Sequence, residues 1–129
     1  MRIFLIIFCL FAQIMAHRFL FAADVDCESD NVFEYTVSYW EGDKQLSKNR
    51  TVTAVKNIFF YQEGATYKIE HPNNVYAKIE HNCTESGEPE FLELWLDGVQ
   101  ADKVVHRIDY YINLSRTDEL PDHSSSTSN

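Results

Sequence analysis

Apolar and polar side chains alternate strictly between Phe33 and Trp40, and this alternation restricts the fold more tightly than any other feature of the sequence. Successive side chains on a β-strand point to opposite faces, so a period of two predicts a half-buried strand. The apolar positions that share one face are Phe33, Tyr35, Val37 and Tyr39. We therefore expect this segment to lie with one face on a hydrophobic core.

Several other short segments have the composition of strands and are separated by turn signals. Residues 75–80 and 103–112 alternate in the same way, residues 51–55 are rich in β-branched side chains, and residues 58–61 are apolar and aromatic. Asp97-Gly98 is a strong turn signal, and Gly64 and Pro72 mark further breaks. Short strands at this spacing, without a convincing amphipathic helix, predict an all-β fold, a two-sheet antiparallel β-sandwich.

The first residues have the layout of a signal peptide. Arg2 is followed by an apolar run that ends before Gln13, and no acidic residue precedes Asp24. This run is shorter than the roughly 20 apolar residues that a membrane-spanning helix needs. We predict cleavage after Ala16, secretion to the extracellular space or cell surface, and no transmembrane segment in the mature chain.

The signal peptide sets the predicted domain organisation. Residues 1–16 are removed, residues 17–26 form an N-terminal segment with the start of the first strand, and residues 27–115 form the sandwich. Residues 116–129 lack an apolar pattern and end in a run of serines, which predicts a disordered tail.

The cysteines and the glycosylation sequons agree with an oxidising compartment. Cys9 leaves with the signal peptide, and the two remaining thiols, Cys27 and Cys83, are predicted to pair. Sequons begin at Asn49, Asn82 and Asn113. Asn49 is the strongest candidate, because it lies in a polar turn segment.

Composition and motifs argue against several functions. The formal net charge of −9 disfavours binding to nucleic acid or to an anionic membrane, since both depend on Lys and Arg. The sequence has no Gly-x-Ser-x-Gly elbow and no glycine-rich phosphate loop, and no histidine pair has the spacing of common zinc sites. We predict no catalytic residues, metal or cofactor, and we interpret His81 and His106 as buried structural residues.

Acidic and aromatic residues provide two candidate surfaces. The first is a group of carboxylates after Cys83, interpreted as a solvated loop with weak calcium binding as the alternative: Glu85, Glu88, Glu90 and Glu93. The second comprises Trp40 and Trp95, which strand alternation places on outward faces. Tryptophan is favoured as an interface anchor, so these two residues are the predicted binding surface unless they are buried in a homo-oligomer.

The order of several motifs resembles the transthyretin-like proteins that nematodes secrete. The motifs are Cys27, Val37-Ser38-Tyr39-Trp40, Ile69-Glu70-His71-Pro72 and His81-Asn82-Cys83. The resemblance implies a prealbumin-like sandwich tied by Cys27 and Cys83. The related ureide hydrolases end in Tyr-Arg-Gly-Ser, which this chain lacks.

These features give the predicted function. We expect a secreted, non-enzymatic binding protein of the transthyretin-like type that recognises an extracellular protein, a lipid or a small apolar ligand. A secreted effector or inhibitor with an unrelated sandwich is the alternative, and a hydrolase is a more distant one.

Mass spectrometry of the secreted protein, before and after reduction and deglycosylation, checks the expected processing. The N-terminus should be His17, and Cys27 and Cys83 should react with alkylating reagents only after reduction. Removal of glycans should lower the mass if the sequons are occupied. Free thiols at both cysteines without reduction would contradict the predicted pairing.

Overall fold

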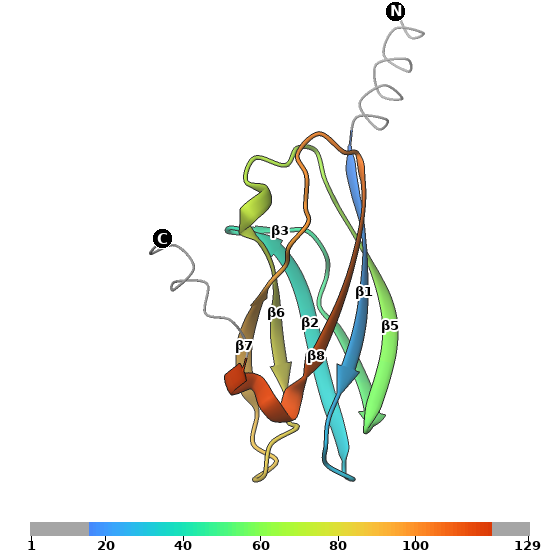
Figure 1. Cartoon of the computed structure of the whole chain (residues 1–129), viewed down its shortest axis with the longest axis vertical. Coiled ribbons are helices and arrows are strands. Elements are labelled where there is room, and N and C mark those ends of the chain that lie inside the picture. Colours follow the sequence, from blue (N-terminus) through green and yellow to red (C-terminus); the bar gives the residue numbers. More distant parts are fainter. Residues whose placement is uncertain (1–15, 120–129) are drawn as a thin grey trace, which may run out of the picture.

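The computed structural model describes residues 16–119 as an all-β domain with two sheets (Figure 1). The three-stranded sheet has the order β5 (Asn57–Thr66), β1 (His17–Asp26) and β8 (Val105–Asn113). The five-stranded sheet has the order β3 (Lys44–Gln45), β2 (Val32–Glu41), β6 (Val75–His81) and β7 (Glu90–Trp95), and β4 (Arg50–Val55) also pairs with β2. Two short 3-10 segments, η1 (Pro72–Asn74) and η2 (Leu114–Glu119), complete the described residues.

β1 is the central strand of the three-stranded sheet. It pairs antiparallel with β5 and parallel with β8, so the expectation of antiparallel pairing fails at β8 and holds for the other pairs. A parallel pair needs a long connection, and here the chain forms the whole five-stranded sheet and β5 between β1 and β8. The sequence predicted only the start of a strand in residues 17–26, whereas the entire segment is a strand.

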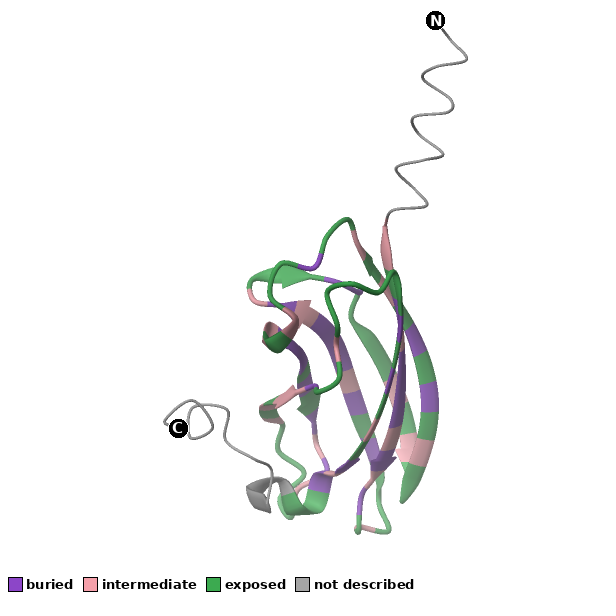
Figure 2. Ribbon diagram, turned by 45° about the horizontal axis from the view of Figure 1, so that its top comes forward, coloured by how far each residue is buried: buried purple, intermediate pink, exposed green. Residues whose placement is uncertain are grey.

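The core lies between the two sheets, and the predicted alternation in β2 is confirmed. Figure 2 shows buried positions recurring along the strands that face each other. The Phe21 ring from β1 stacks on the Tyr39 ring from β2, with centroids 3.7 Å apart and an interplanar angle of 2°. Gly64 of β5 lies against Phe21 and Leu46, because a Cβ there would be only 3.1 Å from the Phe21 ring and 2.9 Å from the Leu46 carbonyl oxygen.

Three tyrosine hydroxyls form a polar contact inside this core. The Tyr110 hydroxyl from β8 lies 2.6 Å from the Tyr39 hydroxyl and 3.2 Å from the Tyr35 hydroxyl, both from β2. Burial raises the pKa of all three phenols. The phenols are therefore neutral, and their hydrogen bonds connect the two sheets without placing a charge in the core.

The predicted disulfide between Cys27 and Cys83 is confirmed. It joins the residue that follows β1 to the segment that follows β6, and therefore links the two sheets. Closing a loop across a separation of 56 residues stabilises the fold by on the order of 4 kcal/mol in the chain-entropy estimate. His81 is buried beside this bridge, where its Nδ1 accepts the Cys83 backbone N–H at 3.0 Å. Burial lowers the pKa of this imidazole.

The ends of the described segment bear on the predicted domain boundaries. β1 begins at His17, directly after the predicted cleavage position, while the signal peptide up to residue 15 lies outside the described residues. η2 extends regular structure to Glu119, beyond the predicted boundary at residue 115, and the rest of the predicted tail again lies outside. None of the helical segments in residues 16–119 has the length and hydropathy to cross a membrane.

Substitution of Phe21 by alanine should destabilise the domain by about 3 to 5 kcal/mol, because it leaves a cavity against Tyr39 in the core. Phe59 is the matched control, since it is also a phenylalanine in the same sheet but is 52% exposed. Chemical denaturation followed by circular dichroism measures both variants. Equal losses for Phe21→Ala and Phe59→Ala would contradict the assigned core.

Candidate binding surface

The outer face of the three-stranded sheet carries three large aromatic side chains that are exposed to solvent. Phe59 and Tyr61 come from β5 and Tyr111 comes from β8, with 52%, 46% and 56% of their surfaces exposed. Strand register places Asp24, Asp26 and Asp109 on the same face of the sheet. We call these six residues the acidic aromatic face.

Strand register explains why residues so far apart in sequence meet on this face. Asp24 of β1 is opposite Phe59 on one side and Tyr111 on the other. In the next row, Ala22 separates Tyr61 from Asp109 and is almost completely buried. The two rows thus place Phe59, Tyr61 and Tyr111 as neighbours on one face of the sheet.

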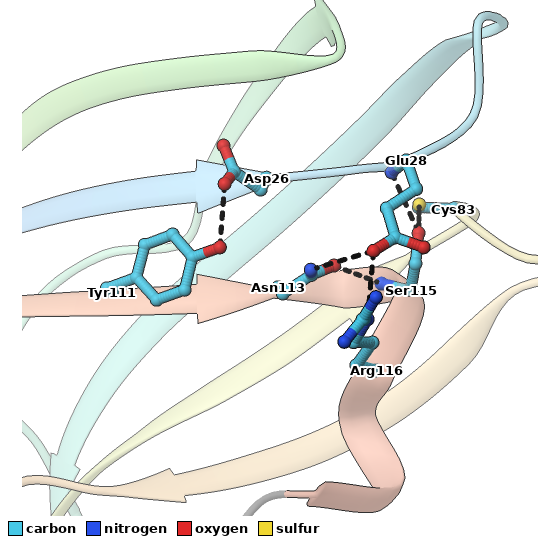
Figure 3. A network of polar contacts seen from close by, with 7 residues as sticks. All are labelled: Asp26, Glu28, Cys83, Tyr111, Asn113, Ser115 and Arg116. Atoms are coloured by element: carbon cyan, nitrogen blue, oxygen red, sulfur yellow. Dashed lines mark hydrogen bonds and ion pairs between the residues drawn. The ribbon is translucent and has the colours of Figure 1, made fainter.

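Neutral donors, rather than cations, hold two of the carboxylates. The Asn57 side-chain amide donates to Asp24 at 2.8 Å and to Asp26 at 2.5 Å. The Tyr111 hydroxyl donates to the other Asp26 oxygen at 2.7 Å (Figure 3). The hydrogen bond from Tyr111, and then the one from Asn57, lowers the pKa of Asp26. Asp26 is therefore charged at neutral pH.

The distribution of cations leaves this part of the face negative. Arg107 pairs with Asp109 at 3.2 Å, and its guanidinium carbon lies 5.9 Å from the centroid of the Tyr61 ring. Within residues 16–119, Asp24 and Asp26 form no ion pair with a lysine, arginine or histidine. The charge on these two carboxylates is therefore available to a ligand.

A polar network fixes the end of the face beside the disulfide (Figure 3). The Arg116 Nε lies 2.9 Å from a Glu28 carboxylate oxygen, and the Glu28 backbone N–H donates to the Ser115 hydroxyl at 2.8 Å. The same hydroxyl lies 3.4 Å from the Cys83 sulfur. These contacts attach the end of β8 to the segment that follows β1, so both strands keep their register at this end.

The three predicted glycosylation sites have different surroundings. Asn49 is exposed in the loop before β4. Asn82 is half-buried, and its side-chain oxygen accepts the Glu34 N–H at 2.8 Å. The Asn113 amide nitrogen, to which a glycan would be attached, lies 3.3 Å from Glu28. Glycosylation stays a prediction at all three, and of these asparagines Asn49 alone is exposed rather than half-buried.

Trp40 and Trp95 lie together on the outer face of the five-stranded sheet, with Tyr76 between them. The Tyr76 and Trp95 rings are 4.6 Å apart, and the Lys78 ammonium lies 3.9 Å from the Trp40 ring centroid. Neighbouring side chains thus partly cover both tryptophans, and each is only half-buried. The structure brings the two predicted residues into one row, but it leaves less aromatic surface open here than on the acidic aromatic face.

Sequence reasoning missed the acidic aromatic face. Residues 58–61 were interpreted as a buried strand because of their composition, yet only Phe60 among them is buried. Alternation in residues 57–63 was the available signal for two exposed aromatics. Nothing in the sequence showed that β8 would pair with β1 and add Tyr111.

The other groups considered from the sequence do not form a site of three side chains. Across the described part of the chain, no three histidine, cysteine, aspartate or glutamate residues are grouped so that they could hold a metal ion. Glu85 and Glu88 are exposed in the loop after Cys83. His81 and His106 are buried, as interpreted from the sequence.

Comparison with known proteins gives one partial match. Protein lin-61 of Caenorhabditis elegans is 34% identical over 102 residues, which cover 67% of this chain and 16% of that protein. No protein-family profile matches the chain. No solved structure matches it either.

This match overturns the predicted function. The prediction depended on short motifs of one to four residues, which recur by chance in unrelated chains. An alignment of 102 residues draws on much more of the domain, and it leads to Protein lin-61. The predicted function, a secreted, non-enzymatic binding protein of the transthyretin-like type, is therefore wrong.

Substitution of Tyr111 by phenylalanine should raise the pKa of Asp26 toward its ordinary value of 3.8, because it removes a hydrogen bond to the charged form. A lowered pKa in the folded state stabilises the domain above the ordinary pKa, and this contribution is lost as the pH falls through the lowered value. Carboxyl NMR titration measures the change. Tyr61→Phe, a control on the same face that has no hydrogen bond to Asp26, should leave the titration unchanged. An unaltered Asp26 titration in Tyr111→Phe would refute the assigned hydrogen bond.

Proposed function

We propose that this domain is a protein-interaction module that binds a lysine- and arginine-rich segment of a partner protein on its acidic aromatic face. The observation that carries the proposal is the carboxylate pair Asp24 and Asp26, which lies next to exposed aromatic rings and has no cation of its own among the described residues. Opposite charge attracts a basic segment, and the net charge of −9 adds to this attraction over a longer range.

The aromatic rings add a second interaction with the same type of ligand. Lysine and arginine side chains bind over aromatic faces and gain about 0.5 to 2 kcal/mol for each such contact. Arg107 already lies near the Tyr61 ring within the domain. Phe59 and Tyr111 flank Asp24 in one row, so a bound cation would contact a carboxylate and a ring at the same time.

The partial match supports the view of a module. The stretch shared with Protein lin-61 is 102 residues, which is the size of one domain, and it covers only 16% of that protein. We propose that this unit supplies one interaction within a larger assembly. We also propose that the domain is not an enzyme.

The location and the kinship of the chain are separate proposals. We propose that the domain folds in an oxidising compartment after cleavage of its signal peptide, and the disulfide supports this, since such bonds persist in oxidising environments. We also propose that the two sheets form a prealbumin-like sandwich with kinship to the transthyretin-like family. The two-sheet arrangement and the Cys27 to Cys83 bridge support this kinship.

Binding of a fluorescent 12-residue peptide of alternating arginine and serine, measured by anisotropy, tests the proposed function. The double substitution Asp24→Asn and Asp26→Asn should weaken binding by at least about tenfold, because an interface charge pair contributes on the order of 1.5 kcal/mol or more. The exposed pair Glu85→Gln and Glu88→Gln changes the net charge equally and should have less than about a twofold effect. Equal losses in both would show attraction to the overall charge alone and would refute the site.

The aromatic contribution has its own matched pair. Phe59→Ser should weaken binding of the same peptide, whereas Phe91→Ser removes a phenylalanine from the five-stranded sheet that is even more exposed, 73% against 52%, and should not. Binding to the wild-type domain should decline as salt concentration rises, because the contacts are exposed. A glycan found on Asn113 would obstruct the end of the face and would contradict the proposal.

A further inference from the structure

Two histidines on different strands bring their ring nitrogens together at one end of the core. His17 is the first residue of β1, and His106 is the second residue of β8. The parallel pairing of these strands sets their positions, with a hydrogen bond of 2.8 Å from the Arg18 backbone N–H to the Val104 carbonyl oxygen. Nδ1 of His17 lies 3.4 Å from Nε2 of His106, and the ring centroids are 5.6 Å apart.

The His106 ring is held in an orientation that suits a metal ligand. It is buried and stacks on Phe19, with centroids 4.7 Å apart and planes 15° apart. It also forms a hydrogen bond to the Lys103 backbone. Because Nε2 faces His17, Nδ1 is the nitrogen left for this bond. Metal-ligating histidines commonly donate their second ring nitrogen to a carbonyl in this way, which fixes the tautomer and the orientation.

The distance between the two nitrogens leaves room for an ion. Two metal–nitrogen bonds of about 2.0 to 2.1 Å across a gap of 3.4 Å enclose an angle of roughly 110°, which is close to tetrahedral. Imidazole nitrogen is a preferred ligand of divalent zinc and copper. Two nitrogens alone form a weak site, and the described residues contain no third histidine, cysteine or carboxylate in the group.

The main chain would supply the missing donor after processing, and this inference rests on the proposed cleavage after Ala16. That cleavage would turn the backbone nitrogen of His17 into a free α-amino group. This amine and Nδ1 of the same histidine can close a six-membered chelate ring on one ion. We propose that the chain beginning at His17 binds one divalent ion, zinc or copper, through its α-amino nitrogen, His17 Nδ1 and His106 Nε2.

This site is separate from the acidic aromatic face and does not depend on it. His17 and His106 are on the inner side of their strands, at the opposite end of β1 from Asp24 and Asp26. The sequence predicted no metal site because no two histidines had a recognised spacing. A separation of 89 residues gives no such spacing, and only strand pairing brings these two together.

Titration of the processed protein with zinc chloride, and separately with copper sulfate, tests the proposal in competition with a chelator of known affinity. The N-terminus is verified by mass before titration. We expect one bound equivalent, with NMR shifts at His17 Nδ1 and His106 Nε2 on zinc binding and paramagnetic broadening of the same signals on copper binding. His106→Gln should weaken affinity for both ions by at least about tenfold, whereas His71→Gln, at an exposed histidine, should not change it.

A second variant keeps both imidazoles and tests the amine. One glycine inserted before His17 moves the free amino group away from the ring, and it should also weaken binding by about tenfold or more. Thermal melting without metal shows whether His106→Gln folds. If it does not, the glycine-insertion variant alone tests the proposal. No stoichiometric binding, an N-terminus other than His17, or unchanged affinity in the glycine variant would overturn the proposal.

Discussion

The backbone pairing of β1 on both of its edges is the interaction on which the rest of the structure depends. β5 binds one edge and β8 the other, so neither flanking strand would belong to a sheet without β1. The inner side of β1 supplies Phe21 to the core, and its outer side supplies Asp24, between Phe59 and Tyr111, and Asp26 in the next row. One ten-residue strand thus organises the packing, the acidic aromatic face and the histidine pair.

The two outer faces of the domain differ in how their aromatic side chains are used. On the five-stranded sheet, Trp40 contacts Lys78 and Trp95 contacts Tyr76. Part of the surface of each tryptophan is therefore covered by side chains of the domain itself. On the three-stranded sheet, the rings stand at the sides of a row whose centre is small or acidic. Exposed apolar area beside unpaired charge is a combination that favours a charged partner over an apolar one.

Alternation in the sequence was sufficient to predict β2, β6 and β8 and the all-β class, because each of these strands has one face in the core and a polar face outside. It was not sufficient for β1, whose residues 19–23 form a continuous apolar run and could be read as the end of a signal peptide. The disulfide followed from the cysteine count. The acidic aromatic face and the histidine pair could not be predicted, because both require the parallel pairing of β1 with β8 across some 80 residues of intervening chain.

The disulfide between Cys27 and Cys83 restrains some strands of the domain covalently and leaves others without such a restraint. The covalent loop encloses β2 to β6, so separation of these strands must occur against a closed ring of chain. β7 and β8 lie beyond this ring and are held by noncovalent contacts alone. Domains open first where restraint is lowest, and β8 is an edge strand that contributes both Tyr111 and His106. A ligand bound at the acidic aromatic face or at the histidine pair would therefore hold β8 against β1 and stabilise the part of the fold that the disulfide does not restrain.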